Sequence, residues 1–298
     1  MASIALKVDV DTLRGTLEGV PGLQQQLLNI GVSATFLFSL GPDHTGWALK
    51  RIFRPGFFKK VSRTSVVEHY GLKTLSYGVL LPSPDIGLKA KHILQAVAKD
   101  GFEVGIHTWD HIVWHDQVRY ADRAWTISQM TKSFDRFIEI FNHPPTTHGA
   151  AGWQMNLEAL QQLDHWQIPY SSDGRAPINL VPYRIKLNEG PSQHIQYPTT
   201  LPTFDELLGV KGMNAQDVVH YLLKLTAQNP NDQVFTLHAE LEGQKLLPAF
   251  EQLLAGWLNQ GHDLVTMGEL HQSWKATNQL DKIAVLPLTW GEIPNRSG

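Results

Sequence analysis

The sequence predicts an α/β fold in which seven or eight strands alternate with helices and form an irregular barrel. Short apolar runs bounded by turn residues recur along the chain, and amphipathic stretches at helical spacing separate them. Carboxylates or histidines follow directly after several of these runs. Alternation of this kind is typical of parallel βα units, whose active sites lie at the carboxyl ends of the strands.

The expected elements follow one another in order along the chain. Strands are expected at Ile4–Val8, Ala34–Phe38, Val104–Ile106, Thr146–Ala150, Pro169–Ser172, Ile195–Thr199, Val234–Leu237 and Asp263–Thr266. Helices are expected where apolar residues recur at helical spacing: Leu23, Leu27 and Ile30; Ile93, Leu94 and Val97; Ile127, Met130, Phe134, Phe137, Ile138 and Phe141; Val218, Val219, Leu222 and Leu223; and Leu246, Phe250, Leu253, Leu254 and Trp257.

Local signals agree with these helices. Asn214, with Asp217 three residues later, is typical of a helix start, and Gly101 and Gly261 stand where helices end. Internal repeats and low-complexity linkers are absent from the sequence, so residues 1–298 are expected to form a single domain.

One long connection, residues 41–88, interrupts the alternation. Its middle carries aromatic residues among basic ones, namely Trp47, Phe53, Phe57 and Phe58 among Lys50, Arg51, Arg54, Lys59, Lys60 and Arg63. This pattern suits a lid over a phosphorylated lipid or a helix on an anionic membrane. The alternative is a packed helical hairpin with a solvated basic face.

Composition excludes several classes of function. The formal net charge of −3 argues against nucleic-acid binding. The chain has no cysteine, so any metal would be held by His, Asp or Glu. No secretion signal and no apolar span long enough for a bilayer are visible, so we expect a cytoplasmic protein that touches a membrane surface.

Two carboxylates close the first strand in "VDVDT". Residues 9 and 11 lie two apart and therefore point to the same side of a strand. In "HTWDH", His107 and His111 are four apart, which would place both imidazoles on one side of a helical turn. Two histidines and one carboxylate form a three-ligand site of the kind that catalytic zinc uses.

A further histidine, His238, ends a late strand in "FTLHAELEG". At that place it could donate a proton to a leaving group. The alternative is a hydrogen-bonded histidine with a structural role only.

Together these segments resemble the polysaccharide deacetylase family, or NodB homology domain. The matching motifs are "VDVDT", "HTWDH" and "TLHAE", in that order, and they extend over most of the chain. The resemblance implies an irregular (β/α) barrel and one divalent metal ion held by Asp11, His107 and His111. It also implies that Asp9 is the general base and His238 the general acid.

The same resemblance implies that a backbone N–H near Ala151 stabilises the oxyanion. Zinc, cobalt, nickel and manganese all suit such ligands. Two motifs depart from the family pattern, because "HGAAG" has His148 at the usual arginine and the fourth motif keeps at most Asp173. The group that orients the base is therefore open, with His148 and Arg175 as candidates.

The departures resemble one subfamily, the 4-deoxy-4-formamido-L-arabinose-phosphoundecaprenol deformylases. The strings in common are "VDVDTLRGTLEGVP", "AAGW", "SSDGR", "PTTLPTFDELLG" and "HAELEG". This implies a metal-dependent hydrolase that removes formate from an undecaprenyl-phosphate-linked formamido sugar, for lipid A modification and polymyxin resistance. Arg14 and Glu240 are the expected contacts to sugar or phosphate.

Two other functions stay open from the sequence. One is deacetylation of another N-acyl sugar, and the other is a catalytically inactive homologue that binds carbohydrate or lipid. Release of acetate would favour the first, and binding without turnover would favour the second.

Overall fold

The structure is a computed structural model and describes residues 2–48, 66–177 and 182–291. Its strands are β1 (Ser3–Val10), β2 (Thr35–Ser39), β3 (Glu103–Thr108), β4 (Thr147–His148), β5 (Tyr170–Ser171), β6 (Tyr183–Leu187), β7 (Gly190–Pro191), β8 (Ile195–Gln196), β9 (Gln233–His238), β10 (Asp263–Val265) and β11 (Ala284–Pro287). All eight expected strands are present, several with shifted ends. The sequence analysis missed β6, β7 and β11, which are short or partly exposed.

The α-helices are α1 (Val20–Ile30), α3 (Val66–Leu75), α4 (Ile86–Lys89), α5 (Lys91–Lys99), α6 (His111–Gln117), α7 (Arg123–Phe141), α8 (Leu157–His165), α9 (Phe204–Leu207), α10 (Ala215–Ala227), α11 (Leu247–Asn259) and α12 (Met267–Ala276). Shorter turns are η1 (Gly15–Gly19), η3 (Val118–Tyr120), η4 (Ala151–Trp153), η5 (Val210–Gly212) and η6 (Leu280–Lys282). The five expected helices are α1, α5, α7, α10 and α11, and the other six, α3, α4, α6, α8, α9 and α12, were not among them.

The local helix signals are confirmed. Asn214 caps α10 in a reciprocal capping box with Asp217. Gly101 and Gly261 follow α5 and α11 with φ of 88° and 82°, values that glycine adopts without strain. One residue of the predicted stripe of α7 is placed differently, because Ile138 is 38% exposed while its neighbour Phe137 is fully buried.

The sheet is an irregular, open barrel. Within the described residues, eight strands run parallel: β10, β1, β2, β3, β4, β5 and β8 follow one another, and β9 pairs with β1. The ladder does not continue from β8 to β9. Instead, the backbone amides of Thr200 and Leu201, which follow β8, both donate to the carbonyl of Val234 in β9. These hydrogen bonds connect the chain after β8 to β9, where the sheet itself is open.

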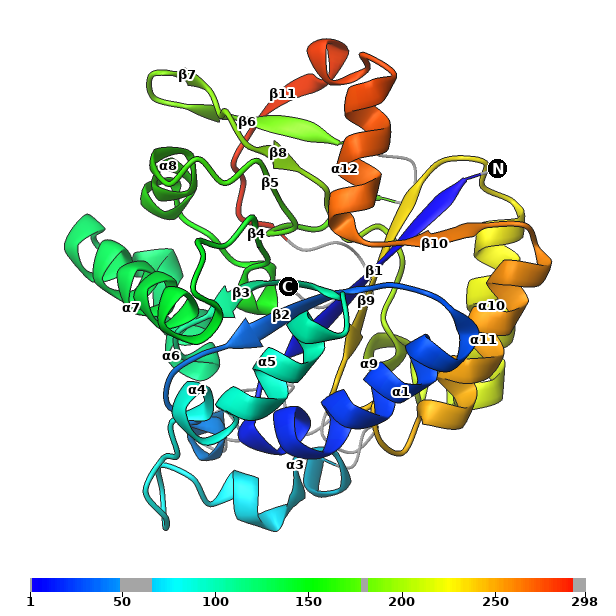
Figure 1. The fold of residues 1–298 in the computed structure, drawn as a ribbon, viewed down its shortest axis with the longest axis horizontal. Coiled ribbons are helices and arrows are strands. Elements are labelled where there is room, and N and C mark those ends of the chain that lie inside the picture. Colours follow the sequence, from blue (N-terminus) through cyan, green and yellow to red (C-terminus); the bar gives the residue numbers. More distant parts are fainter. Residues whose placement is uncertain (1, 49–65, 178–181, 292–298) are drawn as a thin grey trace.

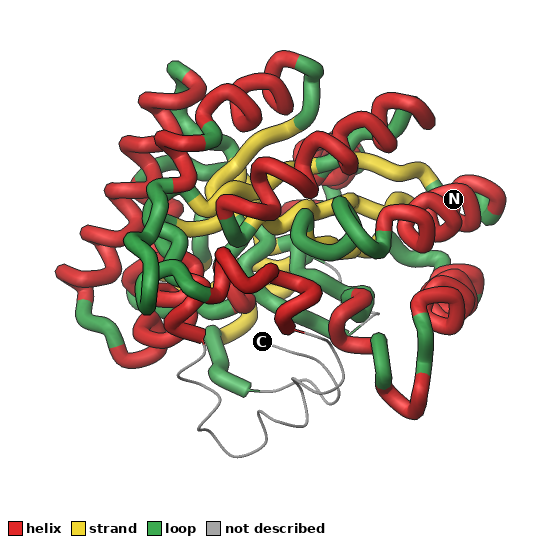
Figure 2. The backbone as a smooth tube through the Cα atoms, turned by 90° about the horizontal axis from the view of Figure 1, so that it is seen from below, coloured by secondary structure: helices red, strands yellow, loops and turns green. Residues whose placement is uncertain are grey.

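Helices surround most of this sheet, as Figures 1 and 2 show from two sides. Adjacent helices are in contact in the order α10, α11, α1, α5, α7 and α8, which is an outer ring. The largest apolar cluster lies between this ring and β1, β2, β3 and β9. The expected α/β class and irregular (β/α) barrel are therefore confirmed, with the short β6, β7 and β11 attached beyond β8.

Side chains on β1 alternate between the two faces of the sheet. Leu6, Val8 and Val10 belong to the apolar cluster beneath the helices. Lys7 and Asp9 occupy the other face, inside the barrel, and both are buried. The barrel interior is therefore polar at the carboxyl end of β1.

The long connection begins after β2 and ends before α5. Its described parts include Trp47, which stacks on His44 with ring centroids 4.0 Å apart, and helices α3 and α4. The basic and aromatic residues from Lys50 to Arg63 lie outside the described residues. Across the described ranges, no helix combines the length and the apolar character that a bilayer crossing requires.

Candidate metal and catalytic site

The candidate site lies at the carboxyl ends of β1, β3 and β9. Parallel register sets Asp9 opposite His238, because these two are Cα partners in the β1–β9 pair. The amide of Ala239 also donates to the carbonyl of Asp9, at 3.0 Å. Residues distant in sequence therefore meet here because the strands are parallel and in this register.

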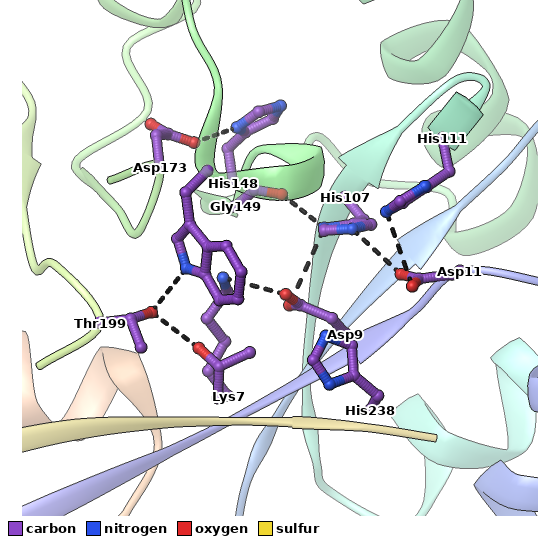
Figure 3. Close-up of polar contacts among 12 residues, drawn as sticks. Lys7, Asp9, Asp11, His107, His111, His148, Gly149, Asp173, Thr199 and His238 are labelled. Carbon is purple, nitrogen blue, oxygen red and sulfur yellow. Dashed lines mark hydrogen bonds and ion pairs between the residues drawn. The ribbon is translucent and has the colours of Figure 1, made fainter. Parts of the chain in front are cut away.

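Asp11, His107 and His111 form the one group within the described residues that has metal-ligand geometry, with one ligand atom of each within 4.8 Å of the others. His107 Nε2 lies 3.2 Å from Asp11 Oδ1, and His111 Nε2 lies 3.5 Å from Asp11 Oδ2. The two imidazole rings stack with centroids 5.3 Å apart. Figure 3 shows both rings turned toward the Asp11 carboxylate.

The two histidines do not share a helical turn, so that expectation was wrong. His107 belongs to β3, and His111 is the first residue of α6. Asp110 caps α6 by accepting from the amide of Val113 at 3.1 Å, so the chain turns sharply between strand and helix. This turn, rather than helical periodicity, brings the rings together.

The hydrogen bonding of these residues fits a bound cation. His107 Nδ1 lies 2.6 Å from the carbonyl of Gly149, and since a carbonyl only accepts, Nδ1 carries the hydrogen. The Nε2 lone pair of neutral His107 then faces Asp11 Oδ1, and both atoms are buried without a hydrogen-bond partner. Either a proton on His107 Nε2 or a cation can satisfy these two atoms, and a divalent metal would supply the positive charge while His107 stays neutral.

Electrostatics around Asp11 point the same way. Burial raises the pKa of the Asp11 carboxyl, but nearby His111 and His107 outweigh it and hold the pKa well below its usual range. The pKa of His107 is raised, because the charges of Asp9 and Asp11 outweigh the effect of burial. Asp11 is therefore ionised at neutral pH and available as a ligand.

Asp9 lies deeper in the barrel than Asp11 and has different partners. Its Oδ2 lies 3.1 Å from the ammonium of Lys7, and its Oδ1 lies 3.8 Å from His107 Nδ1. Oδ1 is buried and accepts no hydrogen bond from the described residues. A carboxylate with one oxygen on a cation and the other uncommitted is suited to accept a proton.

His238, at the end of β9, is surrounded by carboxylates. Its Nδ1 lies 3.9 Å from Asp205 Oδ1, and its backbone amide donates to Glu242 Oε2 at 2.9 Å. Burial lowers the pKa of His238, but Asp205, Asp11 and other acidic groups outweigh burial and raise it to about 9. The imidazole is therefore protonated at neutral pH, as a general acid must be.

Neither sequence candidate for orienting the base contacts it. His148 Nδ1 lies 2.5 Å from Asp173 Oδ1, and Gln196 donates to the other oxygen of Asp173 at 2.8 Å. Arg175 pairs with Glu206 at 2.8 Å. Among the described residues, the cation in contact with Asp9 on the side away from His107 is Lys7.

The three expected substrate contacts have differing surroundings. Ala151 is buried and begins η4, two residues after the carbonyl that holds His107. Arg14 lies beyond the end of β1 and donates to Glu18 at 2.8 Å. Glu240 is buried, and its Oε1 accepts from the amides of Asp11 and Thr12, which shapes the turn after β1. Their contact with substrate stays a prediction.

The sequence analysis missed two residues that line this site. Lys7 shares the inward face of β1 with Asp9, and the i, i+2 spacing in "LKVDVD" is the signal that would have found it. The second residue is Trp153, which has a positive φ of 55°. The Arg175 guanidinium lies 4.1 Å from the centroid of the Trp153 ring, and the His238 ring packs edge-on against Trp153 with the ring centroids 6.4 Å apart. No periodic pattern identifies a residue in such an irregular turn.

Comparison with known proteins gives relatives over the full length. No protein-family model matches the chain. The protein of Shewanella sediminis named "Probable 4-deoxy-4-formamido-L-arabinose-phosphoundecaprenol deformylase ArnD" is 33% identical over 299 residues, covering 100% of this chain and 93% of the relative. The protein of that name from Wigglesworthia glossinidia brevipalpis is 30% identical, covering 95% of this chain and 96% of the relative.

Solved structures extend the comparison to the fold. A chain from Mycobacterium smegmatis, assigned as a polysaccharide deacetylase, is 16% identical with a TM-score of 0.63, covering 98% of this chain and 95% of that one. At this identity the likeness shows that the two chains share a fold.

Proposed function

The chain belongs to the family of 4-deoxy-4-formamido-L-arabinose-phosphoundecaprenol deformylases, and we propose on that basis that it hydrolyses the formamide of this lipid-linked sugar. The products are formate and the 4-amino sugar still attached to its lipid phosphate. One observation supports this reaction type above the others. Asp9 and His238 are Cα partners in neighbouring strands, and they lie beside the candidate metal ligands Asp11, His107 and His111.

Asp11, His107 and His111 would hold one divalent cation. Such a cation lowers the pKa of a water molecule and polarises a carbonyl oxygen. The tautomer fixed by the Gly149 carbonyl directs His107 Nε2 to this place, and Asp11 supplies the negative charge. Zinc, cobalt, nickel and manganese all accept two imidazoles and one carboxylate.

Asp9 and His238 divide the proton transfers. Asp9 Oδ1 takes a proton from the attacking water, whose oxygen forms a new bond to the formyl carbon. Protonated His238 gives its proton to the sugar nitrogen as the C–N bond breaks, so the nitrogen leaves as an amine. Water is consumed once, and one formate and one amine are produced.

The first experiment measures formate release from the synthetic formamido-arabinose phosphate lipid. We expect release that a chelator abolishes and that a divalent metal restores. Asp9→Asn should keep the metal and retain only a small residual turnover, and Lys99→Met, an exposed change on α5, serves as the control. Folded protein that releases acetate from N-acetyl sugars but no formate, or that binds substrate without turnover, would contradict the proposal.

We also propose that the long connection contacts the membrane that holds the lipid substrate. It begins after β2, so its start lies at the same end of the barrel as the site. It also exposes large aliphatic side chains to solvent, with Leu80 83% and Leu72 75% exposed. Exposed apolar side chains that gather in one segment are typical of a surface that binds a partner or a membrane. Residues 49–65, which carry most of its basic charge, would add attraction to anionic lipid. On this proposal the protein works at the cytoplasmic face of the inner membrane, beside its lipid-linked substrate.

Vesicle binding tests this contact. Leu80→Asp together with Leu81→Asp should weaken binding to vesicles of anionic phospholipid about tenfold or more, because both side chains would lose apolar burial. Leu258→Asp is the control, since this exposed leucine ends α11 at the opposite end of the barrel. Equal vesicle affinity of the wild type and the double variant would remove the membrane role.

A further inference from the structure

Lys7 is a lysine in the interior of the barrel. Its side chain is fully buried, and its Cα partners are Thr35 in β2 and Thr236 in β9. Burying an ammonium costs several kcal/mol unless a negative charge compensates it. Asp9, two residues along the same face, supplies that charge at 3.1 Å. The pair is therefore placed by the alternation of β1 itself.

The surrounding residues are shaped to admit this side chain. At Gly149 a Cβ atom would lie 2.8 Å from Lys7 Cε and 2.4 Å from Leu37 Cδ1, so any larger residue would have to displace these two side chains. The Lys7 ammonium also lies 5.4 Å from the centre of the Trp153 ring. The carbonyl of the same Gly149 holds His107. One glycine thus accommodates both Lys7 and a candidate metal ligand.

The other buried basic side chains near the site have different partners. Arg175 pairs with Glu206 and stacks on Trp153, and His148 pairs with Asp173. Lys7 Nζ makes no hydrogen bond within the described residues, so its interaction with Asp9 is an ion pair that fixes the direction of the carboxylate. Figure 3 shows Asp9 between Lys7 on one side and His107 on the other.

We propose that Lys7 is the positioning residue for the general base. Its ammonium holds Asp9 Oδ2, so Oδ1 stays buried and uncommitted on the side of His107, 3.8 Å from Nδ1 of that candidate metal ligand. In this role Lys7 acts on the reaction through Asp9. This role rests on the proposed hydrolysis, in which Asp9 accepts the proton of the attacking water.

Kinetics of Lys7→Met test the role. The variant keeps the unbranched stem and removes the charge. The wild-type protein is assayed first. If it releases no formate, the proposed function itself is wrong, and the comparison with Lys7→Met is made only if the wild type is active. We expect kcat to fall about 100-fold, because a misdirected catalytic group costs about that much, while KM and bound metal are unchanged. Lys7→Arg, which keeps a cation, should restore part of kcat. An unchanged kcat, or a loss confined to KM or to metal affinity, would overturn the proposal.

A double variant tests whether Lys7 acts on turnover through Asp9 rather than by stabilising the fold. In the Asp9→Asn background, Lys7→Met should add no further loss, because the residue it acts through is already removed. A full additional loss would show that Lys7 acts independently of Asp9.

A crystal structure of Lys7→Met gives a readout that needs no turnover. We expect the Asp9 carboxylate to rotate away from the direction that it has in the wild type. An unmoved carboxylate in a folded, metal-loaded variant would overturn the positioning role whatever the activity.

Discussion

At the scale of single residues, two aspartates have different environments, Asp9 within β1 and Asp11 directly after it. The Asp9 carboxylate lies between the Lys7 ammonium and Nδ1 of His107. The Asp11 carboxylate lies between the Nε2 atoms of His107 and His111. A carboxylate enclosed by imidazole lone pairs is suited to a metal, and one paired with an ammonium on one oxygen is suited to take a proton on the other. Position along β1 therefore separates the two proposed roles.

Removal of a candidate ligand should remove the metal. We expect His107→Ala and Asp11→Ala to lose bound divalent metal and to lose the rise in melting temperature that metal addition gives the wild type, because a ligand that binds only the native state stabilises it. Metal content and thermal unfolding, with and without chelator, measure this. His92→Ala, an exposed histidine on α5, should behave as wild type. Metal bound by His107→Ala as tightly as by wild type would reject this ligand set.

The pH dependence of turnover should report His238. A general acid works while protonated, so kcat/KM should fall as pH rises through the raised pKa of about 9. Asp205 is the strongest of the groups that raise this pKa, so Asp205→Asn should move the alkaline limb to lower pH. Asp217→Asn, in the cap of α10, is the matched control. A pH–rate profile with the same alkaline limb in Asp205→Asn and wild type would contradict this assignment.

At the scale of elements, strand ends and the turns after them build the site. β4 has only two residues, yet it supplies His148, and its continuation supplies Gly149 and the turn η4. The buried His148–Asp173–Gln196 group joins the ends of β4, β5 and β8 by side-chain hydrogen bonds. It therefore fixes strands that are too short to hold one another by backbone pairing alone.

Gly149→Ala should disturb this end of the barrel. The added methyl would meet Leu37 and Lys7 at 2.4 and 2.8 Å, and overpacking of this kind costs about 1–3 kcal/mol of unfolding free energy. We expect a lower urea midpoint and a lower kcat, since Lys7 must move. Gly291→Ala is the control, because among the described residues, its chain neighbours aside, no atom lies within 4 Å of the added methyl. Wild-type stability and activity in Gly149→Ala would show that the barrel can relax around it.

At the scale of the whole molecule, an apolar layer separates the strands of the barrel from the outer helices. The interior of the barrel contains polar and charged side chains near the candidate site. Buried titratable groups in that interior couple stability to pH. Burial raises the pKa of Glu242 from 4.5 to about 7 although His238 opposes it. Glu242 therefore favours the native state below pH 4.5, and this contribution is lost as pH rises toward about 7, since the unfolded chain releases the proton first.

Glu242→Gln should flatten this dependence. The amide oxygen can still accept from the His238 amide, and no proton is released. We expect the difference in unfolding free energy between pH 5 and pH 8 to become smaller than in wild type, as urea denaturation would measure. Glu251→Gln, exposed on α11, should leave the difference unchanged. A pH dependence equal to wild type in Glu242→Gln would show that Glu242 ionises freely in the native state.

Sequence patterns determined the parts of this protein that depend on local periodicity. Apolar spacing located the eight parallel strands and the five main helices, because burial against one face repeats every two or every 3.6 residues. Motif order identified the five residues that now form the candidate site, Asp9, Asp11, His107, His111 and His238. The relatives of the chain agree with the family that those motifs indicated.

Only the tertiary structure decided which groups surround those five residues. His194 is fully buried, and its Nδ1 lies 2.6 Å from Oδ1 of Asp164, a residue thirty positions away in the sequence. Lys7 became the partner of Asp9, and His148 and Arg175 were committed elsewhere, because strand register and the irregular turn after β4 set these distances. Partner choice inside a barrel depends on which strands are neighbours, and a linear pattern carries no information on that arrangement.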